Sequence, residues 1–334
     1  MPEVTVAVAN LNGNALLQRN LPALMEQQGV EFEVIVVDGG SADGSVEMLR
    51  RDFPGVRVLD LDRNVGFAAA NNRAIRASAS SLFAMLNNDA APDPDWLSEL
   101  VSVARGRPEF GSFASRMVFA HEPETINSAG ISLDLAGIAW DRMMGEPDAG
   151  GPREVFGPSG GAALYRRELL EDVGGFDERF FAYLEDVDLA WRARLAGWRC
   201  LYVPTARVLH EHSATAVEGS TFKNYHLGRN KIWTIFKNYP MPQLLLYSPL
   251  IAGYDLASLP YTLATKRDVS ILSGRIAALA ALPGLIGERR RIQSRRRASW
   301  NELASQMDGF QPPWKLFSRY ARLRRIVSRK PARS

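Results

Sequence analysis

The sequence predicts an α/β protein with a parallel sheet and helices on both of its faces. Within the first hundred residues, short runs rich in β-branched side chains alternate with segments that have helical apolar spacing. This β-α-β-α order is typical of a parallel sheet, which binds ligands at the carboxyl ends of its strands. The expected strands are Val4–Ala9, Glu33–Val37, Val56–Leu61 and Leu82–Leu86, and the expected helices are Asn14–Gln28, Ser45–Arg51 and Phe67–Ala79.

The later elements follow less regularly and indicate that the sheet becomes mixed. A small-residue loop at 157–161 precedes one strand, and an acidic pair opens a helix soon after it. Pro240 and Pro242 then break the chain before two long apolar stretches. The expected elements are strands at Arg116–Phe119, Ile131–Leu133, Ala162–Tyr165, Cys200–Val203 and Val208–His210, a helix at Leu184–Leu195, and apolar stretches at Leu244–Ala264 and Ile271–Ile286.

Composition indicates a folded protein of the cytoplasm. The chain has 334 residues, of which 46% are hydrophobic and 23% charged, so it is long enough for one large or two ordinary domains. Its single cysteine, Cys200, cannot form an internal disulfide, and this favours a reducing compartment. The N-terminus lacks a basic region followed by a long apolar core, so we expect a first strand there and not a signal peptide.

The net charge of +3 hides an asymmetry between the two ends of the chain. Residues 266–334 contain 17 Lys and Arg against 4 Asp and Glu, whereas residues 1–265 contain 23 against 33. The body is therefore acidic and the C-terminal region strongly basic. This split favours metal and nucleotide chemistry in the body and attachment to an anionic surface by the C-terminal region.

Carboxylates and a histidine stand at or beside the expected strand ends. Asp38, Asp89, the pair Glu185–Asp186 and His210 all follow or adjoin apolar runs. Carboxylates placed in this way can bind a nucleotide, hold a divalent metal ion and supply a base. The combination predicts transfer of a group from a nucleotide-activated donor. No Walker A string and no GxGxxG after the first strand are present, which disfavours ATPase and dinucleotide-binding functions.

Several ordered motifs give the chain a resemblance to the family 2 glycosyltransferases, which have a GT-A fold. They include VVDGGSADGS, RNVGFAAANNRAI, LNNDAAPDPDWL, FFAYLEDVDLAWRARLAGW, LHEHSAT and YHLGRNKIWTIFKNYP, and the similarity extends from Val4 to about Pro240. Within that family the chain is most similar to bacterial rhamnosyltransferase-like enzymes of surface-polysaccharide assembly. The resemblance implies a GT-A domain at 1–239, with a nucleotide-binding half at about 1–105 and a catalytic half at 106–239, followed by a helical, basic region at 240–334.

The resemblance implies a donor site along the first strands. Asp38 is expected to accept a hydrogen bond from the imide N–H of uracil or thymine, although an Asx-turn at a strand end is the alternative. Gly66 allows the backbone to approach the nucleotide, and the helix that follows it can present its N-terminus to phosphate. Arg229 is expected near the diphosphate, although a helix-surface arginine is the alternative. The expected donor-binding residues are Asn10, Asp38, Ser41, Asn64, Gly66, Phe67, Asn72, Asn88 and Arg229.

Asp89 stands where the family carries its metal-binding Asp-x-Asp triad. Here the triad is Asn87–Asn88–Asp89, so the first carboxylate is missing. One carboxylate together with diphosphate oxygens and water is enough for Mg²⁺ or Mn²⁺, because these ions take oxygen ligands and keep several waters. The resemblance implies that His210 contacts the metal or the diphosphate, and a solvated loop histidine is the alternative. Such an ion would offset the charge that builds up on the leaving diphosphate.

The acidic pair at the start of the expected helix 184–195 matches the family position of the general base. Asp186 is implied to remove the proton of the acceptor hydroxyl, and Glu185 is expected at the acceptor. Carboxylates that merely complement the helix dipole are the alternative. The loop Ser159–Gly160–Gly161 resembles an acceptor-side loop. The Gln-x-x-Arg-Trp string of processive synthases is absent, which favours addition of one residue per encounter.

The C-terminal region combines apolar helical stretches with six arginines at 289–291 and 295–297. An apolar helix beside an arginine cluster is typical of an interfacial membrane anchor. Nucleic-acid binding is disfavoured because no array of stacking aromatics accompanies the arginines. A solvated or oligomerising helical region is the alternative. Leu244–Ala264 is long enough to span a bilayer, but Asp255 and Pro260 favour an interfacial or re-entrant placement.

The sequence as a whole predicts an inverting, metal-dependent glycosyltransferase on the cytoplasmic face of the membrane. It would move a sugar, most simply L-rhamnose from dTDP-rhamnose, from a dTDP- or UDP-linked donor to a glycan or lipid-linked acceptor in polysaccharide synthesis. A catalytically silent nucleotide-sugar-binding scaffold protein is the alternative, and the missing first carboxylate of the metal triad is its best support. A sugar-1-phosphate nucleotidyltransferase would need a Gly-rich loop with Arg or Lys, which the first loop lacks.

Overall fold

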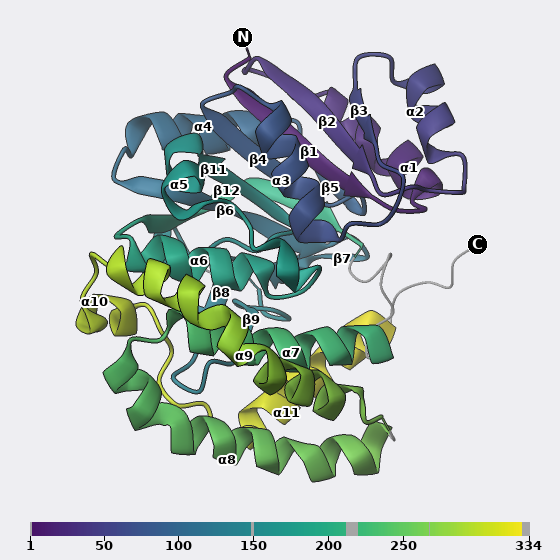
Figure 1. Cartoon of the computed structure of the whole chain (residues 1–334). Coiled ribbons are helices and arrows are strands. Elements are labelled where there is room, and N and C mark those ends of the chain that lie inside the picture. The colour runs from purple at the N-terminus through teal and green to yellow at the C-terminus, as the bar shows by residue number, and fades with distance from the viewer. Residues whose placement is uncertain (1, 148–149, 212–219, 267, 329–334) are drawn as a thin grey trace.

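A computed structural model of the chain describes residues 2–147, 150–211, 220–266 and 268–328. A large sheet with helices on both faces forms one end of the molecule, and a layer of long helices forms the other (Figure 1). The sheet has ten strands, in the order β10–β12–β6–β11–β4–β1–β2–β3, with β5 paired to β12 and β7 paired to β6. A separate two-stranded sheet, β8–β9, lies between the large sheet and the helical layer (Figure 1).

The N-terminal half of the sheet is parallel, as its β-α-β order predicts. Strands β1, β2 and β4 are mostly apolar and largely buried, because they lie between helices on both faces, whereas the edge strand β3 is half charged and more exposed. In register, Asn10 at the end of β1 faces Asp38 at the end of β2. The elements are β1 (Val4–Asn10), α1 (Asn14–Met25), β2 (Phe32–Asp38), α2 (Ser45–Asp52), β3 (Arg57–Asp60), α3 (Phe67–Ala77) and β4 (Leu82–Leu86).

The middle of the chain completes a mixed sheet. Strand β11 is antiparallel to both β4 and β6, whereas β12 runs parallel to β6. The elements are β5 (Ala90–Pro92), α4 (Trp96–Gly106), β6 (Phe110–Phe119), β7 (Glu122–Ser128), β8 (Ile131–Leu133), β9 (Ala139–Asp141), β10 (Arg153–Val155), β11 (Ala162–Arg166), α5 (Arg167–Val173), the 3₁₀ helix η1 (Glu178–Phe180), α6 (Glu185–Leu195) and β12 (Arg199–His210).

The two expected strands at Cys200–Val203 and Val208–His210 are one strand, which corrects the sequence prediction. Strand β12 runs through both segments, and its pairing with β6 shifts register between Val203 and Arg207. Pro204 lies in this interval and has no N–H to donate to a neighbouring strand, so the pairing is interrupted although the strand continues. The same feature broke the apolar pattern in the sequence.

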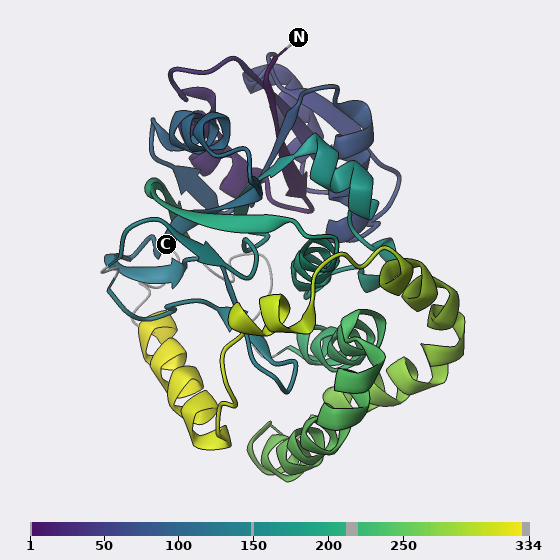
Figure 2. The ribbon, with the colours of Figure 1, turned by 90° about the vertical axis from the view of Figure 1, so that its left-hand side faces the viewer.

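Two apolar cores cover the faces of the sheet. One contains Trp96, Leu97 and Leu100 of α4 together with side chains of α1, and the other contains alanines of α3 together with Leu189 and Ala193 of α6. A third core joins α6 to the helical layer through Trp191, which packs against Tyr239 with ring centroids 5.0 Å apart. Helix α6 therefore lies between the sheet and the helical layer, as Figures 1 and 2 show.

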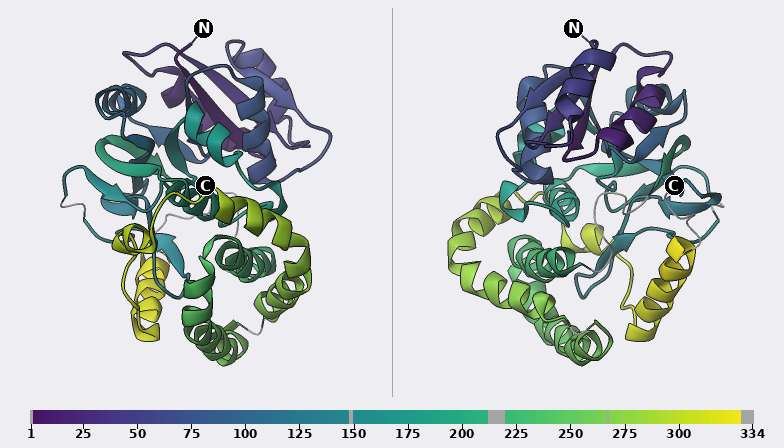
Figure 3. Two further views of the ribbon diagram at one scale, coloured as in Figure 1. Left: turned by 60° about the vertical axis from the view of Figure 1, so that its left-hand side comes forward. Right: turned by 90° about the vertical axis from the view of Figure 1, so that its right-hand side faces the viewer.

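The helical layer consists of α7 and the C-terminal region. Helix α9 packs along α7, with Trp233 of α7 donating from its indole N–H to the carbonyl of Ala278. Figure 3 shows α8 at the end of the molecule farthest from the sheet, with α11 set apart beside it. The helices are α7 (Thr221–Asn238), α8 (Met241–Lys266), α9 (Ser270–Ser294), α10 (Trp300–Ser305) and α11 (Pro313–Ser328).

A buried charge network also ties this layer to the body. The ammonium group of Lys237, on α7, is completely buried and lies 2.6 Å from Asp177, 2.9 Å from Asp188 and 3.3 Å from Glu288 of α9. Asp188 in turn accepts from Arg192 at 2.7 Å within α6. Buried charges persist only when they are paired in this way. The domain boundary expected at 239 stays a prediction.

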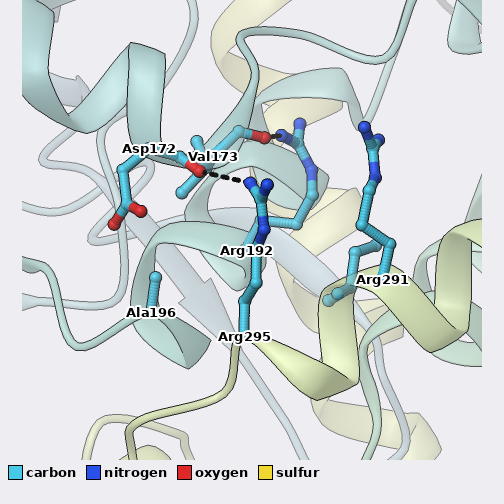
Figure 4. Close-up of a pocket in the computed structure, with 7 residues that line it drawn as sticks. Asp172, Val173, Arg192, Ala196, Arg291 and Arg295 are labelled. Atoms are coloured by element: carbon cyan, nitrogen blue, oxygen red, sulfur yellow. Dashed lines mark hydrogen bonds between the residues drawn. The ribbon is translucent and has the colours of Figure 1, made fainter.

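Of the six arginines at 289–291 and 295–297, Arg291 pairs with Glu288 at 3.9 Å and three others bind backbone carbonyls. Arg289 is buried and donates to the carbonyl of Phe236, and Arg297 donates to the carbonyl of Ala196. In the hollow shown in Figure 4, Arg295 donates to the carbonyl of Asp172 at 3.0 Å, and Arg192 donates to that of Val173 at 2.8 Å. This segment therefore fastens α9 to α5 and α6, a role that the sequence did not predict.

Candidate active site

The carboxylate of Asp38 lies at the strand edge where the sequence predicted the donor site. It is completely buried and accepts from the Asn10 amide at 2.8 Å, from the Ser41 hydroxyl at 2.8 Å and from the Ser41 backbone N–H at 2.7 Å. Three of its roughly four acceptor positions are thus filled. These bonds form the Asx-type turn that was the alternative reading. A contact with the nucleobase stays a prediction.

A chain of amides joins Asp38 to the expected metal triad. The Asn88 side chain donates to the amide oxygen of Asn10 at 2.8 Å, and the carbonyl of Asn88 accepts from Asn20 at 3.0 Å. Gly13 is required beside this chain, because a Cβ at that position would lie 2.3 Å from the Asn10 amide oxygen and 2.4 Å from the Asn88 nitrogen. Neighbouring parallel strands therefore place Asn10, Asp38 and Asn88 in one rigid polar row.

Asp89 and His210 meet at the end of the sheet as predicted for a metal site. Strand β5 pairs with β12, and this brings Nε2 of His210 to 3.0 Å from Oδ1 of Asp89. Nδ1 of His210 lies 2.8 Å from the amide oxygen of Asn127, which can only accept, so Nδ1 carries the proton. An oriented histidine of this kind is usual for metal ligands.

The spacing of this pair suits a divalent cation. Adjacent ligands of an octahedral ion at about 2.1 Å lie about 3 Å apart, which matches the separation of the Asp89 and His210 atoms. Among the described residues, no group of three or more histidine, cysteine or acidic side chains is placed to hold a metal ion. Further ligands would therefore come from a diphosphate and water.

Asp186 occupies the first turn of α6 and faces the loop at 159–161. The backbone N–H of Gly160 donates to its Oδ2 at 2.8 Å, and that of Val187 donates to its Oδ1 at 2.8 Å. Burial raises the pKa of Asp186 to about 6, with a further contribution from the charge of Asp141. A carboxylate with this pKa is ionised at neutral pH and more basic than an ordinary aspartate.

Glu185 has the opposite character although it is the adjacent residue. Burial and the charge of Asp186 raise the pKa of Glu185 well above its usual range, and this favours the neutral carboxylic acid. Its Oε2 atom is buried without a hydrogen-bond partner in the described structure. Environments that separate the pKa values of two carboxyls are the usual basis for giving them different roles.

The loop Ser159–Gly160–Gly161 connects Asp186, the predicted base, to the predicted metal triad. Gly160 binds Asp186, and the carbonyl of Gly161 accepts from the backbone N–H of Asn87 at 2.9 Å. A Cβ at Gly161 would lie 2.5 Å from the end of the Met117 side chain, which would have to move, whereas a Cβ at Gly160 would be in ordinary contact with Asp186 at 3.4 Å. The loop 159–161 therefore contacts both Asp186 and the triad 87–89, so three separately predicted parts of the site lie side by side.

The segment at 64–72 adjoins the same region. Gly66, at φ 84°, has no room for a Cβ, which would lie 2.5 Å from the carbonyl of Phe181. The Asn64 side chain accepts from the N–H of Gly66 at 2.9 Å. The side chain of Asn72 has a structural role: its amide nitrogen donates to the carbonyl of Phe176, and its amide oxygen accepts from the N–H of Phe176. The donor-binding roles of Asn64, Gly66, Phe67 and Asn72 stay predictions.

Arg229 serves the structure in a way that the sequence did not indicate. Its guanidinium donates to the carbonyls of Arg179 and Phe180 and lies 4.4 Å from the ring centroid of Trp233. Asn230, the next residue, places its amide nitrogen 2.7 Å to 3.0 Å from the carbonyls of Phe180, Ala182 and Tyr183. Both residues support the loop ahead of Asp186. A contact of Arg229 with the donor stays a prediction.

Two residues of this site were missed by sequence reasoning. Asn127 orients His210, as described above. Asp141, at the end of β9, accepts hydrogen bonds from the hydroxyls of Ser128 and Ser159 and interacts with the charge of Asp186. Burial raises the pKa of Asp141. Both lie on irregular edge strands with no strong periodicity, so only the fold reveals that they approach the site.

Comparisons with known proteins agree with this geometry. The description "Glycosyl transferase family 2" matches residues 5–174, which is more than half of the chain. The chain belongs to glycosyltransferase family 2. It is a rhamnosyltransferase-like member of that family and an enzyme that transfers a glycosyl group, which confirms the expectation drawn from its motifs.

Curated relatives lie at about 30% identity. The N-acetylglucosaminyl-diphospho-decaprenol L-rhamnosyltransferase of Mycobacterium tuberculosis is 30% identical over 243 residues, which cover 63% of this chain and 77% of that protein. The O-antigen biosynthesis protein RfbC of Myxococcus xanthus is 31% identical over 230 residues, which cover 64% of this chain but only 18% of that much longer protein.

Solved structures confirm the fold. The mannosyltransferase PcManGT of Pyrobaculum calidifontis, in complex with GDP-Man and Mn²⁺, is 20% identical and superposes with a TM-score of 0.54 over 91% of this chain and 86% of that one. Staphylococcus aureus TarS gives a TM-score of 0.58 at 17% identity over 87% of this chain and 50% of that one. The expected GT-A architecture, a mixed sheet with flanking helices and a helical C-terminal region, is therefore confirmed.

Proposed function

We propose that the enzyme is an inverting, metal-dependent transferase that moves L-rhamnose from dTDP-rhamnose to a lipid-linked or growing glycan in cell-surface polysaccharide synthesis. The observation that carries the proposal is the loop 159–161, which joins the carboxylate of Asp186 to the Asp89–His210 pair through the triad. The name of the Mycobacterium tuberculosis relative supports rhamnose as the sugar and a diphospho-polyprenol acceptor.

Asp186 would act as the general base. Its carboxylate takes the proton of the acceptor hydroxyl while that oxygen forms a bond to the anomeric carbon. The bond from the anomeric carbon to the nucleotide diphosphate breaks at the same time, and its electron pair leaves with the diphosphate. Gly160 and Val187 fix the two carboxylate oxygens of Asp186, so the base is oriented before the acceptor arrives. Glu185, favoured in its neutral form, can donate a hydrogen bond to the acceptor.

Mg²⁺ or Mn²⁺ would bind between the donor diphosphate and the Asp89–His210 pair. When bound, the ion offsets the negative charge of the leaving diphosphate. Asn127 keeps the histidine ring in the orientation that presents Nε2 toward Asp89. The missing first carboxylate of the triad is replaced by Asn87, whose backbone N–H is bound to Gly161, so this position contributes to loop geometry.

The protein would work on the inner face of the cytoplasmic membrane, held by α8 and α9. Large apolar side chains are exposed along both helices, and by length and composition α9 is the one helix in the described chain that could cross a membrane. Asp255, the charge in the apolar stretch of α8, is paired with Lys231 and Arg275. The exposed residues are Met241, Leu245, Leu246 and Leu256 on α8 and Ile276, Leu279 and Ile286 on α9, with Val269 between the helices.

Donor and acceptor specificity can be tested with the purified full chain. A panel of dTDP-, UDP- and GDP-sugars is incubated with Mn²⁺ and a short-chain N-acetylglucosaminyl-diphospho-lipid, and the product is identified by mass spectrometry. We expect a product with dTDP-rhamnose that is lost on chelation and has inverted anomeric configuration. Transfer of another sugar would overturn rhamnose, and nucleotide-sugar binding without turnover of any donor would favour the silent scaffold protein.

A further inference from the structure

Four ring side chains form a cluster that none of the roles above uses. Phe181 and Tyr183 lie on the loop ahead of α6, and Phe222 and His226 lie in the first two turns of α7. The ring centroids of Phe222 and His226 are 4.2 Å apart, and Phe222 lies 6.0 Å from Phe181 and 6.3 Å from Tyr183. Phe222 is 46% exposed, whereas His226 is buried. We call these four residues the aromatic patch.

The loop that carries the patch is held in a costly conformation. Phe181, Tyr183 and Leu184 have φ values of 66°, 68° and 64°, in the left-handed region that non-glycine residues avoid. A residue in this conformation is strained and persists only where its surroundings enforce it. Here the enforcement comes from Asn230, which is completely buried and whose amide lies within 3.0 Å of three carbonyls of this loop.

The patch adjoins the predicted base and also borders the predicted donor segment, because a Cβ on Gly66 would lie 2.7 Å from ring atoms of Phe181. Leu184 caps α6, and Asp186 follows two residues later. Helix α6 lies between the sheet and α7, the helix that carries Phe222 and His226 (Figure 1). Lys223 lies 5.5 Å from the ring centroid of Tyr183 and interacts with the charge of Asp141, so polar groups border the rings.

We propose that the aromatic patch binds the terminal sugar ring of the acceptor. A pyranose has an apolar face of C–H groups and a polar edge of hydroxyls. An exposed ring such as Phe222 offers a rigid apolar contact at little entropic cost, and Lys223 and Asp141 can pair with the hydroxyls. The strained loop would then hold the sugar platform and Asp186 in one fixed relation. This assignment rests on the proposed function, because it presumes a sugar acceptor.

The test compares Phe222→Ala with a matched control. Phe310 is similarly exposed at 48%, contacts Tyr254 and belongs to no predicted site, so Phe310→Ala controls for loss of an exposed phenyl ring. Titration calorimetry with the N-acetylglucosaminyl-diphospho-lipid, in the presence of dTDP and Mn²⁺, measures acceptor affinity directly. We expect Phe222→Ala to weaken acceptor binding by about tenfold. Phe222→Trp should restore it, and Phe310→Ala should not weaken it.

Steady-state kinetics give a second readout. The patch predicts a rise in the acceptor KM of Phe222→Ala with a donor KM close to that of the wild type. Equal rises in the donor and acceptor KM values would indicate a general effect on the site and would overturn the proposed acceptor contact. An unchanged acceptor Kd in Phe222→Ala would also overturn it. If the wild type binds the lipid but transfers no sugar, the proposed function fails while the Kd values still decide the patch. If the wild type does not bind this lipid, the patch is overturned for this acceptor class.

Discussion

The predicted donor edge and the predicted acceptor side of this candidate site are built by different means. At the donor edge, parallel strands end together and place Asn10, Asp38 and Asn88 in a row of mutually satisfied hydrogen bonds. At the predicted acceptor side, a loop and the first turns of α6 and α7 carry the functional groups, Phe181, Tyr183 and Leu184 have positive φ, and an oxygen of Glu185 is buried without a partner among the described residues. The donor edge is fixed by sheet geometry, whereas the acceptor side combines backbone strain with a buried, electrostatically unfavourable pair of carboxyls at Glu185 and Asp186.

This difference suits two separate roles, donor binding at the strand edge and adjustment of a carboxylate pKa at the acceptor side. A site that must hold a donor of constant structure is well served by a rigid strand edge. A site that must raise the pKa of a carboxylate needs burial and nearby like charge, and these are costly. The comparison predicts that changes on the acceptor side will affect turnover more than donor affinity, and that changes at the metal pair will do the reverse.

The largest effect is expected for Asp186→Asn, which keeps the shape of the side chain and removes its basicity. Transfer should fall by about 10²-fold or more, because a general base typically contributes about 10²–10⁴-fold. Donor affinity should stay close to wild type, since the amide still fills the space beside Gly160. Initial rates with a coupled diphosphate assay measure this, and Glu171→Gln, at an exposed position on α5, is the control. Wild-type turnover in the variant would move the base to another residue, with Glu185 the first to examine.

The next effect concerns the opposite side of the comparison. Asp89→Ala removes the carboxylate that lies 3.0 Å from His210, and we expect the Mn²⁺-dependent part of nucleotide diphosphate affinity to fall about 10–100-fold. Calorimetry of dTDP binding with and without Mn²⁺ separates this part from the rest. Asp93→Ala removes a nearby carboxylate that pairs with Arg207 outside the site and should leave the metal dependence intact. If Asp89→Ala retained full metal dependence, the ion would have to bind elsewhere.

A third change probes the strained loop itself. Asn230→Ala removes the amide that supports three carbonyls, and each buried carbonyl left unpaired costs about 1–3 kcal/mol. We expect a lower free energy of unfolding in denaturant titrations and a fall in kcat with dTDP affinity largely preserved. Asn301→Ala, at an exposed position of α10, is the control for loss of an asparagine. Unchanged stability and kcat would show that the loop keeps its conformation without Asn230.

The sequence alone predicted the strand-built donor edge better than the acceptor side. Strands β1, β2 and β4 and helices α1 to α3 match their expected positions closely, because local apolar periodicity determines them. The strand-end residues Asn10 and Asp38 follow directly from that register. Asp89 and His210, the predicted metal ligands, are 121 positions apart in the sequence. Apolar periodicity could not predict that they meet, and only the family resemblance assigned both residues to one site.

The acceptor side was less predictable for a physical reason. The left-handed residues at 181–184 contain no glycine, and their conformation depends on Asn230, which lies about fifty positions later. Asn127 and Asp141 stand on the edge strands β7 and β9, whose short, irregular pairing leaves no alternating pattern. The arginines 289, 295 and 297 were assigned to a membrane-binding cluster, because nothing in the sequence shows which carbonyls they bind.

The smallest expected effect concerns the acidity of the base. Because burial raises the pKa of Asp186 to about 6, protonation should remove the active form below that pH, and kcat/KM should fall about tenfold per unit at more acidic pH. Like-charge repulsion from Asp141 is part of this rise, so Asp141→Asn should make Asp186 easier to ionise. The acidic limb of the profile should then move modestly to lower pH, while the rate on the alkaline plateau falls only to the extent that Asp141 also contacts the acceptor.

Buffers of constant ionic strength are needed for this comparison, because screening weakens the interaction between the two carboxylates. Ser128→Ala removes one hydrogen bond to Asp141 without changing the charge of the site, so it serves as the matched control and should leave the acidic limb in place. A limb that moves to higher pH in Asp141→Asn would mean that the carboxylate of Asp141 helps Asp186 to ionise. In that case the raised pKa of Asp186 would have to come from burial alone. Like-charge repulsion would then no longer distinguish the acceptor side from the donor edge.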